Sequence, residues 1–384
     1  MIDFFEFQLR PRVQFKVGLV DEMAPEIARL ESTRAIIVAD DGVVKTGMLD
    51  RVHAGLAGGI EIVGDFCDIP ANSSVESVER GAAFAKEINA DVIVAVGGGS
   101  PIDTAKCMRI LMSEGGKLHD YEGYNLLDKP LVPMIAIPTT AGTGSEVTPF
   151  AVIRDEAAEV KLTFASPFLA PELAILDPTM TQTLPARLTA ATGMDALTHA
   201  IESFVSTEAN PISDSLGLQA IDLISNNLRA ATHTGNDMEA RGQMLVAACI
   251  AGMAFSSGFL GIVHAMAHAI GGSYPVHHGT ANSILLPHAM RFNSEIAPNR
   301  FARIARSMGV NAGGRAEEYV IEDGIAAVTA LANDCNMPMR LRDVAVPKEA
   351  LPALAEVALT DGTIFTNPRT ATVEEIVQLL EEAW

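Results

Sequence analysis

The chain has 384 residues, of which 20% are charged, with 48 acidic residues against 27 basic ones. This length predicts two domains or one large domain, and the acidic balance argues against nucleic acid or an anionic membrane as the partner, because both require a positive surface. The four cysteines lie far apart without a CxxC spacing, and acidic residues stand where a signal peptide would be apolar. We therefore expect a reducing, cytoplasmic location.

Apolar runs typical of β-strands recur through the first 180 residues, and stretches with helical spacing lie between several of them, at 75–89 and 101–113. Strands that alternate with helices predict an α/β domain with a largely parallel sheet. The predicted strands cover residues 35–41, 58–66, 90–100, 130–146 and 173–177.

From residue 185 onward the apolar residues repeat with helical spacing only, which predicts an all-α second domain. The change of pattern falls within residues 178–184, so we place the domains at 1–181 and 182–384.

The stretch between Arg241 and Arg291 contains no Asp, Glu, Lys or Arg. Serines, a glycine pair, a proline and histidines interrupt it, so no window holds the ~20 apolar residues of a membrane span, and we predict two central helices packed on all sides. Imidazoles in an interior are costly unless something binds or pairs with them. Five of the nine histidines lie here, which calls for a chemical role: His264, His268, His277, His278 and His288.

A glycine turn, Gly97-Gly98-Gly99, follows the predicted strand at 90–100 and leads into a helix. Ser100 suits the N-cap, with Pro101 in the first turn and Asp103 at a capping-box spacing. Such a helix start offers free N–H groups to a phosphate. The alternative is a tight turn without a ligand, and the ordinary GxGxxG fingerprint is absent.

A second loop, residues 138–146, leaves another apolar strand as a run of small hydroxylated residues that cannot pack a core. Two such loops at strand ends of one sheet predict a nucleotide between them. Asp40, at the end of the first predicted strand, is the candidate for binding the ribose hydroxyls, against the alternative of an ordinary turn acid. With no basic residue at 39–44 to accept a 2′-phosphate, Asp40 predicts NAD rather than NADP.

Asp195 and His199 stand four residues apart and share a helical face, between alanines rather than charged residues. His264 and His268 repeat this spacing, and His277 and His278 follow. An aspartate with histidines suits zinc or iron(II). One carboxylate and three neutral imidazoles leave a divalent ion with a net positive charge, which favours an alkoxide and hence hydride transfer to or from a nicotinamide.

These motifs resemble the iron-containing (group III) alcohol dehydrogenases over essentially the whole chain. The resemblance implies a dehydroquinate synthase-like fold, with an N-terminal dinucleotide-binding α/β domain, an all-α C-terminal domain and an active site in the cleft between them. It rests on VGGGSPIDTAK, PTTAGTGSEVT, DPTMTQTLP, GMDALTHAIE, GIVHAMAHAIGG, HHGTANSILLPH and TNPR.

Carried over by motif, the resemblance implies site residues for the metal, the proton relay and the cofactor. Two positions depart from the family: Ser73 and His277 each stand where proline is more usual. The implied metal ligands are Asp195, His199, His264 and His278; His268 is the proton relay; and NAD is bound by Asp40, Asn72, Gly98, Gly99, Ser100, Asp103, Thr139, Thr140, Thr143, Ser145 and Lys161.

We therefore predict an NAD-dependent oxidoreductase, with iron(II) or alternatively zinc, acting on a small primary alcohol or aldehyde. Phe150, Phe255 and Phe259 are expected to wall the substrate pocket, and the chain is expected to form a homodimer or a higher homo-oligomer. The alternatives are a polyol or hydroxy-acid dehydrogenase of the same fold, a mononuclear metal hydrolase and a non-catalytic binding protein. A hydrolase would not need a dinucleotide cradle.

Overall fold

The computed structural model describes residues 4–8, 10–70, 72–158 and 160–384. The chain divides into two compact units by its internal contacts. The α/β unit comprises Gln8–Thr140 and Gly144–Leu184. The helical unit comprises Pro185–Trp384 together with the short segment Ala141–Thr143 and residues 4–7.

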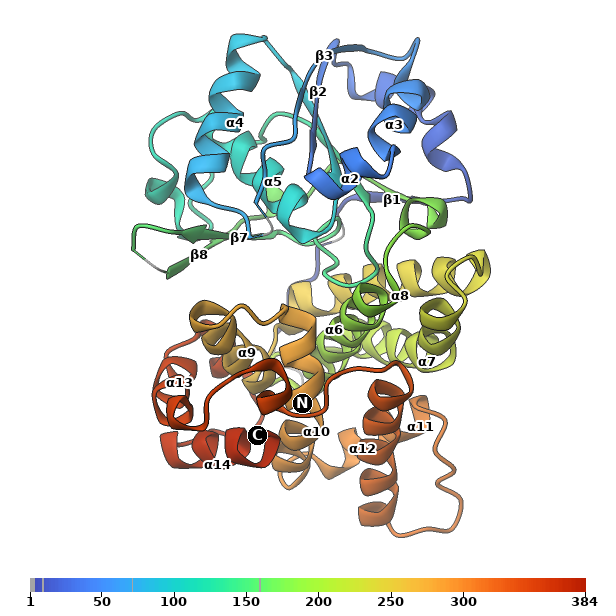
Figure 1. Ribbon diagram of the computed structural model, residues 1–384, viewed down its shortest axis with the longest axis vertical. Helices are drawn as coiled ribbons and strands as arrows, with labels where there is room; N and C mark the ends of the chain where they lie inside the picture. The colour runs from blue at the N-terminus through green and yellow to red at the C-terminus, as the bar shows by residue number, and fades with distance from the viewer. Residues whose placement is uncertain (1–3, 9, 71, 159) are drawn as a thin grey trace. The chain divides into compact units, whose positions relative to one another are not determined.

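The α/β unit is built on a six-stranded parallel sheet with the order β1-β9-β6-β4-β2-β3. Figure 1 labels β1, β2 and β3 of this sheet. The prediction of a parallel sheet is confirmed, although the four-residue strand β1 was not predicted. The strands are β1 Arg12–Phe15, β2 Arg34–Ala39, β3 Glu61–Phe66, β4 Val92–Gly97, β6 Met134–Pro138 and β9 Leu173–Leu176.

Helices cover both faces of this sheet, which explains why its central strands are apolar along their whole length. On one face, side chains such as Ile36 and Ile93 pack against α4 and α5; on the other, Ile37 and Val94 pack against α3. The helices of this unit are α1 Ala24–Ile27, α2 Asp41–Lys45, α3 Met48–Leu56, α4 Val75–Glu87 and α5 Gly99–Ser113.

A smaller sheet with the order β5-β8-β7 was not predicted. Its strands are β5 Gly123–Tyr124, β7 Phe150–Asp155 and β8 Val160–Ala165, and the last two form an antiparallel hairpin. The side chains of β7 alternate between buried and partly exposed. Charged residues, Arg154 and Asp155 at the end of β7 and Lys161 in β8, interrupt the apolar pattern of this hairpin.

The helical unit confirms the predicted all-α second domain. Its central helix is α6, in which every residue from Thr189 to Val205 is buried. The helices are α6 Ala186–Val205, α7 Pro211–His233, α8 Met238–Gly258, α9 Ile262–Ser273, α10 His278–Ser294, α11 Pro298–Ser307, α12 Glu317–Asp334, α13 Leu351–Leu359 and α14 Val373–Ala383.

The uncharged stretch 242–290 is distributed over three helices, α8, α9 and α10, so the prediction of two central helices was wrong. Glycines and a proline divide it, at Gly258–Gly261 and before His277. No single helix among the described residues is long and apolar enough to cross a membrane; α8 and α9 pass that test only as a pair, with a bend of 104° between them.

Candidate active site

Helix α6 carries the first two members of a polar cluster in an otherwise apolar interior. Asp195 and His199 lie one turn apart on the same face, as their spacing predicted, and both are nearly fully buried, with exposures of 3% and 4%. Polar side chains this deep in a core are retained only when they have partners.

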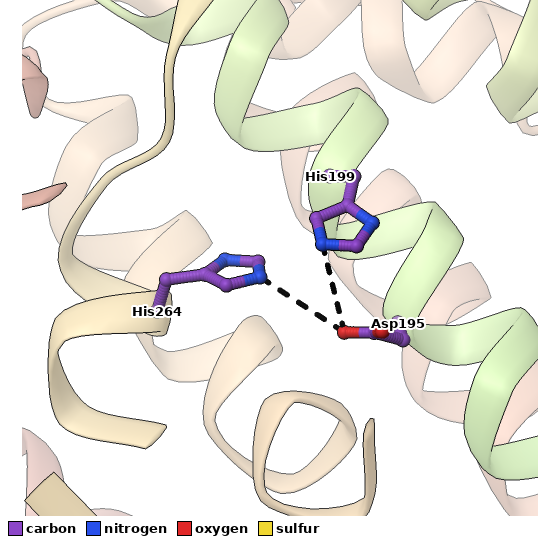
Figure 2. Close-up of side chains that lie close together, drawn as sticks. All are labelled: Asp195, His199 and His264. Atoms are coloured by element: carbon purple, nitrogen blue, oxygen red, sulfur yellow. Dashed lines mark ion pairs between the residues drawn. The ribbon is translucent and has the colours of Figure 1, made fainter. Parts of the chain in front are cut away.

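Three imidazoles converge on a single oxygen, Oδ1 of Asp195. Figure 2 shows two of them, His199 and His264, with Asp195. The Nε2 atoms of His199, His264 and His278 lie 3.8, 3.9 and 3.6 Å from it. His264 comes from α9 and His278 begins α10, so three helices bring together residues that are far apart in the chain. The ligand atoms of Asp195, His199 and His264 all lie within 4.8 Å of one another.

The electrostatics of the cluster keep at least one lone pair available for a cation. Burial lowers the pKa of His199 to about 4, more than Asp195 raises it, so this imidazole is neutral at pH 7. Burial also acts to lower the pKa of His264, but the neighbouring carboxylates, Glu202 foremost, together outweigh it and the pKa is raised.

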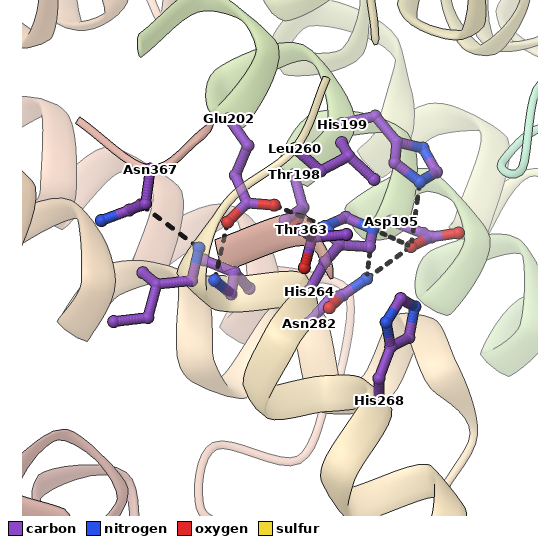
Figure 3. Close-up of polar contacts among 12 residues, drawn as sticks. Asp195, Thr198, His199, Glu202, Leu260, His264, His268, Asn282, Thr363 and Asn367 are labelled. Carbon is purple, nitrogen blue, oxygen red and sulfur yellow. Dashed lines mark hydrogen bonds and ion pairs between the residues drawn. The ribbon is translucent and has the colours of Figure 1, made fainter. Parts of the chain in front are cut away.

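Two further side chains complete the cluster and were not predicted (Figure 3). Glu202, on α6, lies 2.5 Å from His264 Nδ1 through its Oε2. Asn282, on α10, donates from Nδ2 to Asp195 Oδ1 at 2.6 Å, and the same nitrogen lies 3.2 Å from Nε2 of both His264 and His278. The sequence carried a signal for Glu202, because it continues the helical face of Asp195 and His199 at the next turn.

The donor set fits a divalent cation. Two carboxylates, Asp195 and Glu202, are almost completely buried, and within the described residues their ion pairs are to histidines rather than to lysine or arginine. Buried carboxylates are costly without a positive partner. The NH₂ group of Asn282 points at Asp195 Oδ1 and at Nε2 of His264 and His278. A hydrogen-bond donor therefore lies where these acceptor atoms converge.

The cluster is less buried on one side. The His278 side chain is 34% exposed, and the His268 ring stacks on it with centroids 5.3 Å apart. His268 is held through Nδ1 by Asp361 Oδ2 at 2.8 Å, and this contact helps to lower the pKa of Asp361 to about 2, against the opposing effect of burial. The Phe255 ring packs against His199, with centroids 4.6 Å apart.

The α/β unit carries the predicted nucleotide loops at one edge of its main sheet. Strands β6, β4 and β2 are adjacent and parallel, with Ala39 paired to Val96 and Gly97 to Pro138. The loops that follow them, which hold Asp40, Gly98 and Thr139–Thr140, therefore leave the sheet at the same edge, where α/β sheets bind ligands.

The glycine turn after β4 lies close to the hydroxyl loop. A Cβ on Gly98 would come within 3.2 Å of the Thr140 side chain, and Thr139 N donates to Gly97 O at 3.0 Å. Helix α5 begins at Gly99 with Gly98 as its N-cap, so the predicted N-cap role of Ser100 was wrong. Without a side-chain cap, the N–H groups of this first turn remain suited to a phosphate.

Asp103 does not form a capping box; it holds the hydroxyl loop instead. Its carboxylate accepts hydrogen bonds from Ser145 Oγ and from the backbone N of Val152 at 3.0 Å. Lys106, one turn later and fully buried, donates to Ser145, Thr148 and Phe150. Lys106 was not predicted, although it follows Asp103 on the same helical face.

The structure places the remaining predicted cofactor residues in different parts of the chain's fold. Asp40 caps the short helix α2 by accepting from Val43 N at 3.0 Å. Asn72 is exposed and precedes Ser73, whose hydroxyl donates to Ser100 O at 2.8 Å, a tie that proline could not form. Lys161 lies exposed on β8, and Thr143 belongs to the segment Ala141–Thr143 that groups with the helical unit.

Comparison with known proteins shows which family shares these motifs. The family described as "Iron-containing alcohol dehydrogenase" matches residues 11–178, and "Fe-containing alcohol dehydrogenase family, C-terminal" matches residues 189–384. The chain belongs to the iron-containing alcohol dehydrogenase family. The resemblance inferred from the motifs is confirmed, and so are the fold class and the assignment as an alcohol/aldehyde oxidoreductase.

Individual members of this family are similar over nearly their whole length. The chain is 42% identical to 1,3-propanediol dehydrogenase of Klebsiella pneumoniae over 358 residues, which is 92% of each chain. It is 38% identical to the NAD-dependent methanol dehydrogenase of Bacillus methanolicus, over 95% of this chain and 96% of that one. The crystal structure of a 1,3-propanediol oxidoreductase superimposes with a TM-score of 0.97 at 40% identity, over 99% of this chain and 100% of that chain. Family membership decides against the metal-hydrolase alternative.

Proposed function

We propose that the protein transfers a hydride between NAD(H) and a small primary alcohol or aldehyde, at a divalent metal ion held by Asp195, His199, His264 and His278. The single observation that carries this proposal is the convergence of three imidazole Nε2 atoms on Asp195 Oδ1 at 3.6–3.9 Å. Iron(II) is the proposed metal, because the family is named for it, and zinc is the alternative for the same donor set.

The chemistry divides between the metal and the protein. A bound divalent ion would polarise the oxygen of an alcohol or aldehyde and stabilise the alkoxide form. The protein side chains orient the ligands, exclude water from the buried face next to Phe255, and supply a proton carrier. His268, stacked on His278 and fixed through Nδ1 by Asp361, is the proposed proton carrier.

The proposed cofactor is NAD(H), bound at the loop edge of the main sheet. The start of α5 offers backbone N–H groups to the pyrophosphate, and the hydroxyl loop held by Asp103 and Lys106 offers side-chain donors. The carboxylate of Asp40 would face the adenosine ribose, where it repels a 2′-phosphate. The name of the methanol dehydrogenase relative supports NAD as the cofactor in this family.

The proposed substrate class is supported by the relatives and by the Phe255 ring, which packs against His199 in the cluster. The names of the relatives specify a three-carbon diol and methanol, which are short and lightly polar. A short diol is therefore the alternative substrate within the same reaction.

The test is a substrate panel run with a defined metal. Chelator-treated protein is reloaded anaerobically with iron(II) or zinc, and C2–C6 alcohols, diols and aldehydes are assayed with NAD(H) and NADP(H). We expect reduction of short aldehydes with NADH that depends on the added metal. Turnover that is insensitive to metal removal would contradict the proposal. We also expect the iron-loaded form, but not the zinc-loaded form, to lose activity in air, because iron(II) can be oxidised and zinc cannot.

A further inference from the structure

Helix α9 begins without a cap from its own segment. Its N-cap is Gly261, which has no side chain to accept from the first free N–H groups. Two side chains from distant parts of the chain take this role (Figure 3). Asn367 Oδ1 accepts from Ile262 N at 3.2 Å, and Glu202 Oε1 accepts from Val263 N at 2.7 Å.

The second carboxylate oxygen of Glu202 bonds to the next residue along. Glu202 Oε2 lies 2.5 Å from His264 Nδ1, so one carboxylate holds both the start of the helix and the imidazole in its first turn. A carboxylate only accepts hydrogen bonds, so the proton of His264 lies on Nδ1. The amide of Asn282, which donates toward His264 Nε2 at 3.2 Å, agrees with this tautomer.

We propose that Glu202 is a positioning residue of the metal site, which fixes the Nδ1–H tautomer of His264 and so keeps the Nε2 lone pair directed at the metal. This inference rests on the proposed function, because it assumes that His264 is a ligand. Hydrogen bonds from ligand imidazoles to a carboxylate are a general means of orienting metal ligands.

The side chains around Glu202 are closely packed. Glu202 is 2% exposed. A Cβ on Gly261 would come within 2.8 Å of Asn367 Oδ1 and 3.1 Å of Glu202 Oε1, so glycine is needed for both side chains to reach α9. Asn367 Oδ1 also accepts from Asn293 Nδ2 at 2.9 Å, which gives the asparagine of the TNPR motif a structural role.

The charge and both oxygens of Glu202 are required, which makes Glu202→Gln a sharp test. A glutamine has one acceptor and one donor group where the carboxylate has two acceptors. If its oxygen accepts from Val263 N, its NH₂ faces His264 Nδ1 and favours the opposite tautomer, with the proton on Nε2. If its oxygen faces His264, its NH₂ opposes the Val263 N–H. Either orientation weakens the site without changing side-chain volume.

The experiment measures metal affinity rather than turnover. Zinc and cobalt(II) dissociation constants are determined by competition with a chromophoric chelator, for the wild-type protein, Glu202→Gln and a control, Glu146→Gln. Glu146 is a carboxylate of the α/β unit that is equally buried, at 2% exposure. We expect Glu202→Gln to weaken binding by roughly 10- to 100-fold and the control to leave it within about twofold.

The outcomes separate this inference from the proposed function. Wild-type protein that binds no stoichiometric metal would overturn both. If the wild type binds metal tightly and folded Glu202→Gln has the same dissociation constant, only the proposed role of Glu202 is overturned. This holds even if the variant is less stable, because the cap of α9 contributes to stability without setting metal affinity.

A second measurement needs no variant at Glu202, in case Glu202→Gln does not fold. In the zinc-loaded wild type, ¹⁵N NMR of histidine-labelled protein reports which ring nitrogen carries the proton. We expect His264, assigned by its absence from His264→Gln, to be protonated at Nδ1 and bound to metal at Nε2. A His264 ring protonated at Nε2 would overturn the inference.

Discussion

The close contact between α10 and α6 at Gly279 gives a direct test of how the metal ligands are held. Gly279 follows His278, and a Cβ at this position would lie 2.2 Å from the backbone oxygen of Ala191 and 3.1 Å from Asp195 Cβ. Ordinary Cβ contacts are 3.4 Å or longer, so Gly279→Ala must separate α10 from α6 by roughly 1 Å. Backbone oxygen cannot rotate away as a long side chain can.

Two consequences follow from a displacement of this size. Overpacking a rigid interior costs about 1–3 kcal/mol, which for a unit of this size lowers the melting temperature by roughly 2–12 °C. Metal–ligand distances deviate from their ideal values by only about 0.2 Å in a working site. Moving His278 away from Asp195 by several times that amount should therefore weaken metal binding by about tenfold or more.

The assay compares Gly279→Ala with Gly272→Ala by thermal unfolding and by chelator competition. Gly272 lies exposed near the end of α9, and a Cβ there would meet nothing within 4 Å, so the control should behave as the wild type in both measurements. An unchanged metal affinity and melting temperature in Gly279→Ala would refute the argument that this glycine sets the spacing of the ligands.

Three further predictions concern other parts of the chain. Asp40→Gly should narrow or reverse the preference for NADH over NADPH, read as kcat/KM for both cofactors; a ratio equal to wild type would leave Asp40 only as the cap of α2. His268→Ala should retain its metal and slow turnover by roughly 10²–10⁴-fold, whereas loss of metal would make His268 a ligand. Burial raises the pKa of Glu146 from 4.5 to about 7. Between these pH values the folded state therefore binds more protons than the unfolded state, and the stability of the wild type falls as the pH rises from 4.5 to 7. Glu146→Gln should therefore gain up to about 3 kcal/mol relative to wild type from pH 4.5 to 7, and a pH-independent difference in denaturant unfolding would contradict the cause given for the shift.

The elements that the sequence predicted well are those specified by local pattern. The strands β2, β4, β6 and β9 are continuous apolar runs because both of their faces are covered, and the helices after Pro185 show a period that needs no tertiary information. The Asp195–His199 pair was also local, since a spacing of four residues places two side chains on one face whatever surrounds them.

The features that were missed depend on contacts between distant segments. Serine is a common N-cap residue, which is why Ser100 was predicted as the N-cap, but α5 begins at Gly99 and its N-cap is Gly98. The carboxylate of Asp103 is used by Ser145 and Val152, about forty to fifty residues away. The role of Glu202 requires knowing that α9 begins beside α6, which no periodicity within either helix reveals.

The central claim is that one divalent metal ion binds at the point where the ligands from α6, α9 and α10 converge. The most direct test is the metal content per chain, measured by plasma emission spectroscopy after dialysis, in the wild type and in His264→Ala, with NADH binding followed by fluorescence in the same samples. The account predicts about one iron or zinc per wild-type chain, and none in His264→Ala, with NADH binding preserved in both. Full metal occupancy in His264→Ala would contradict it.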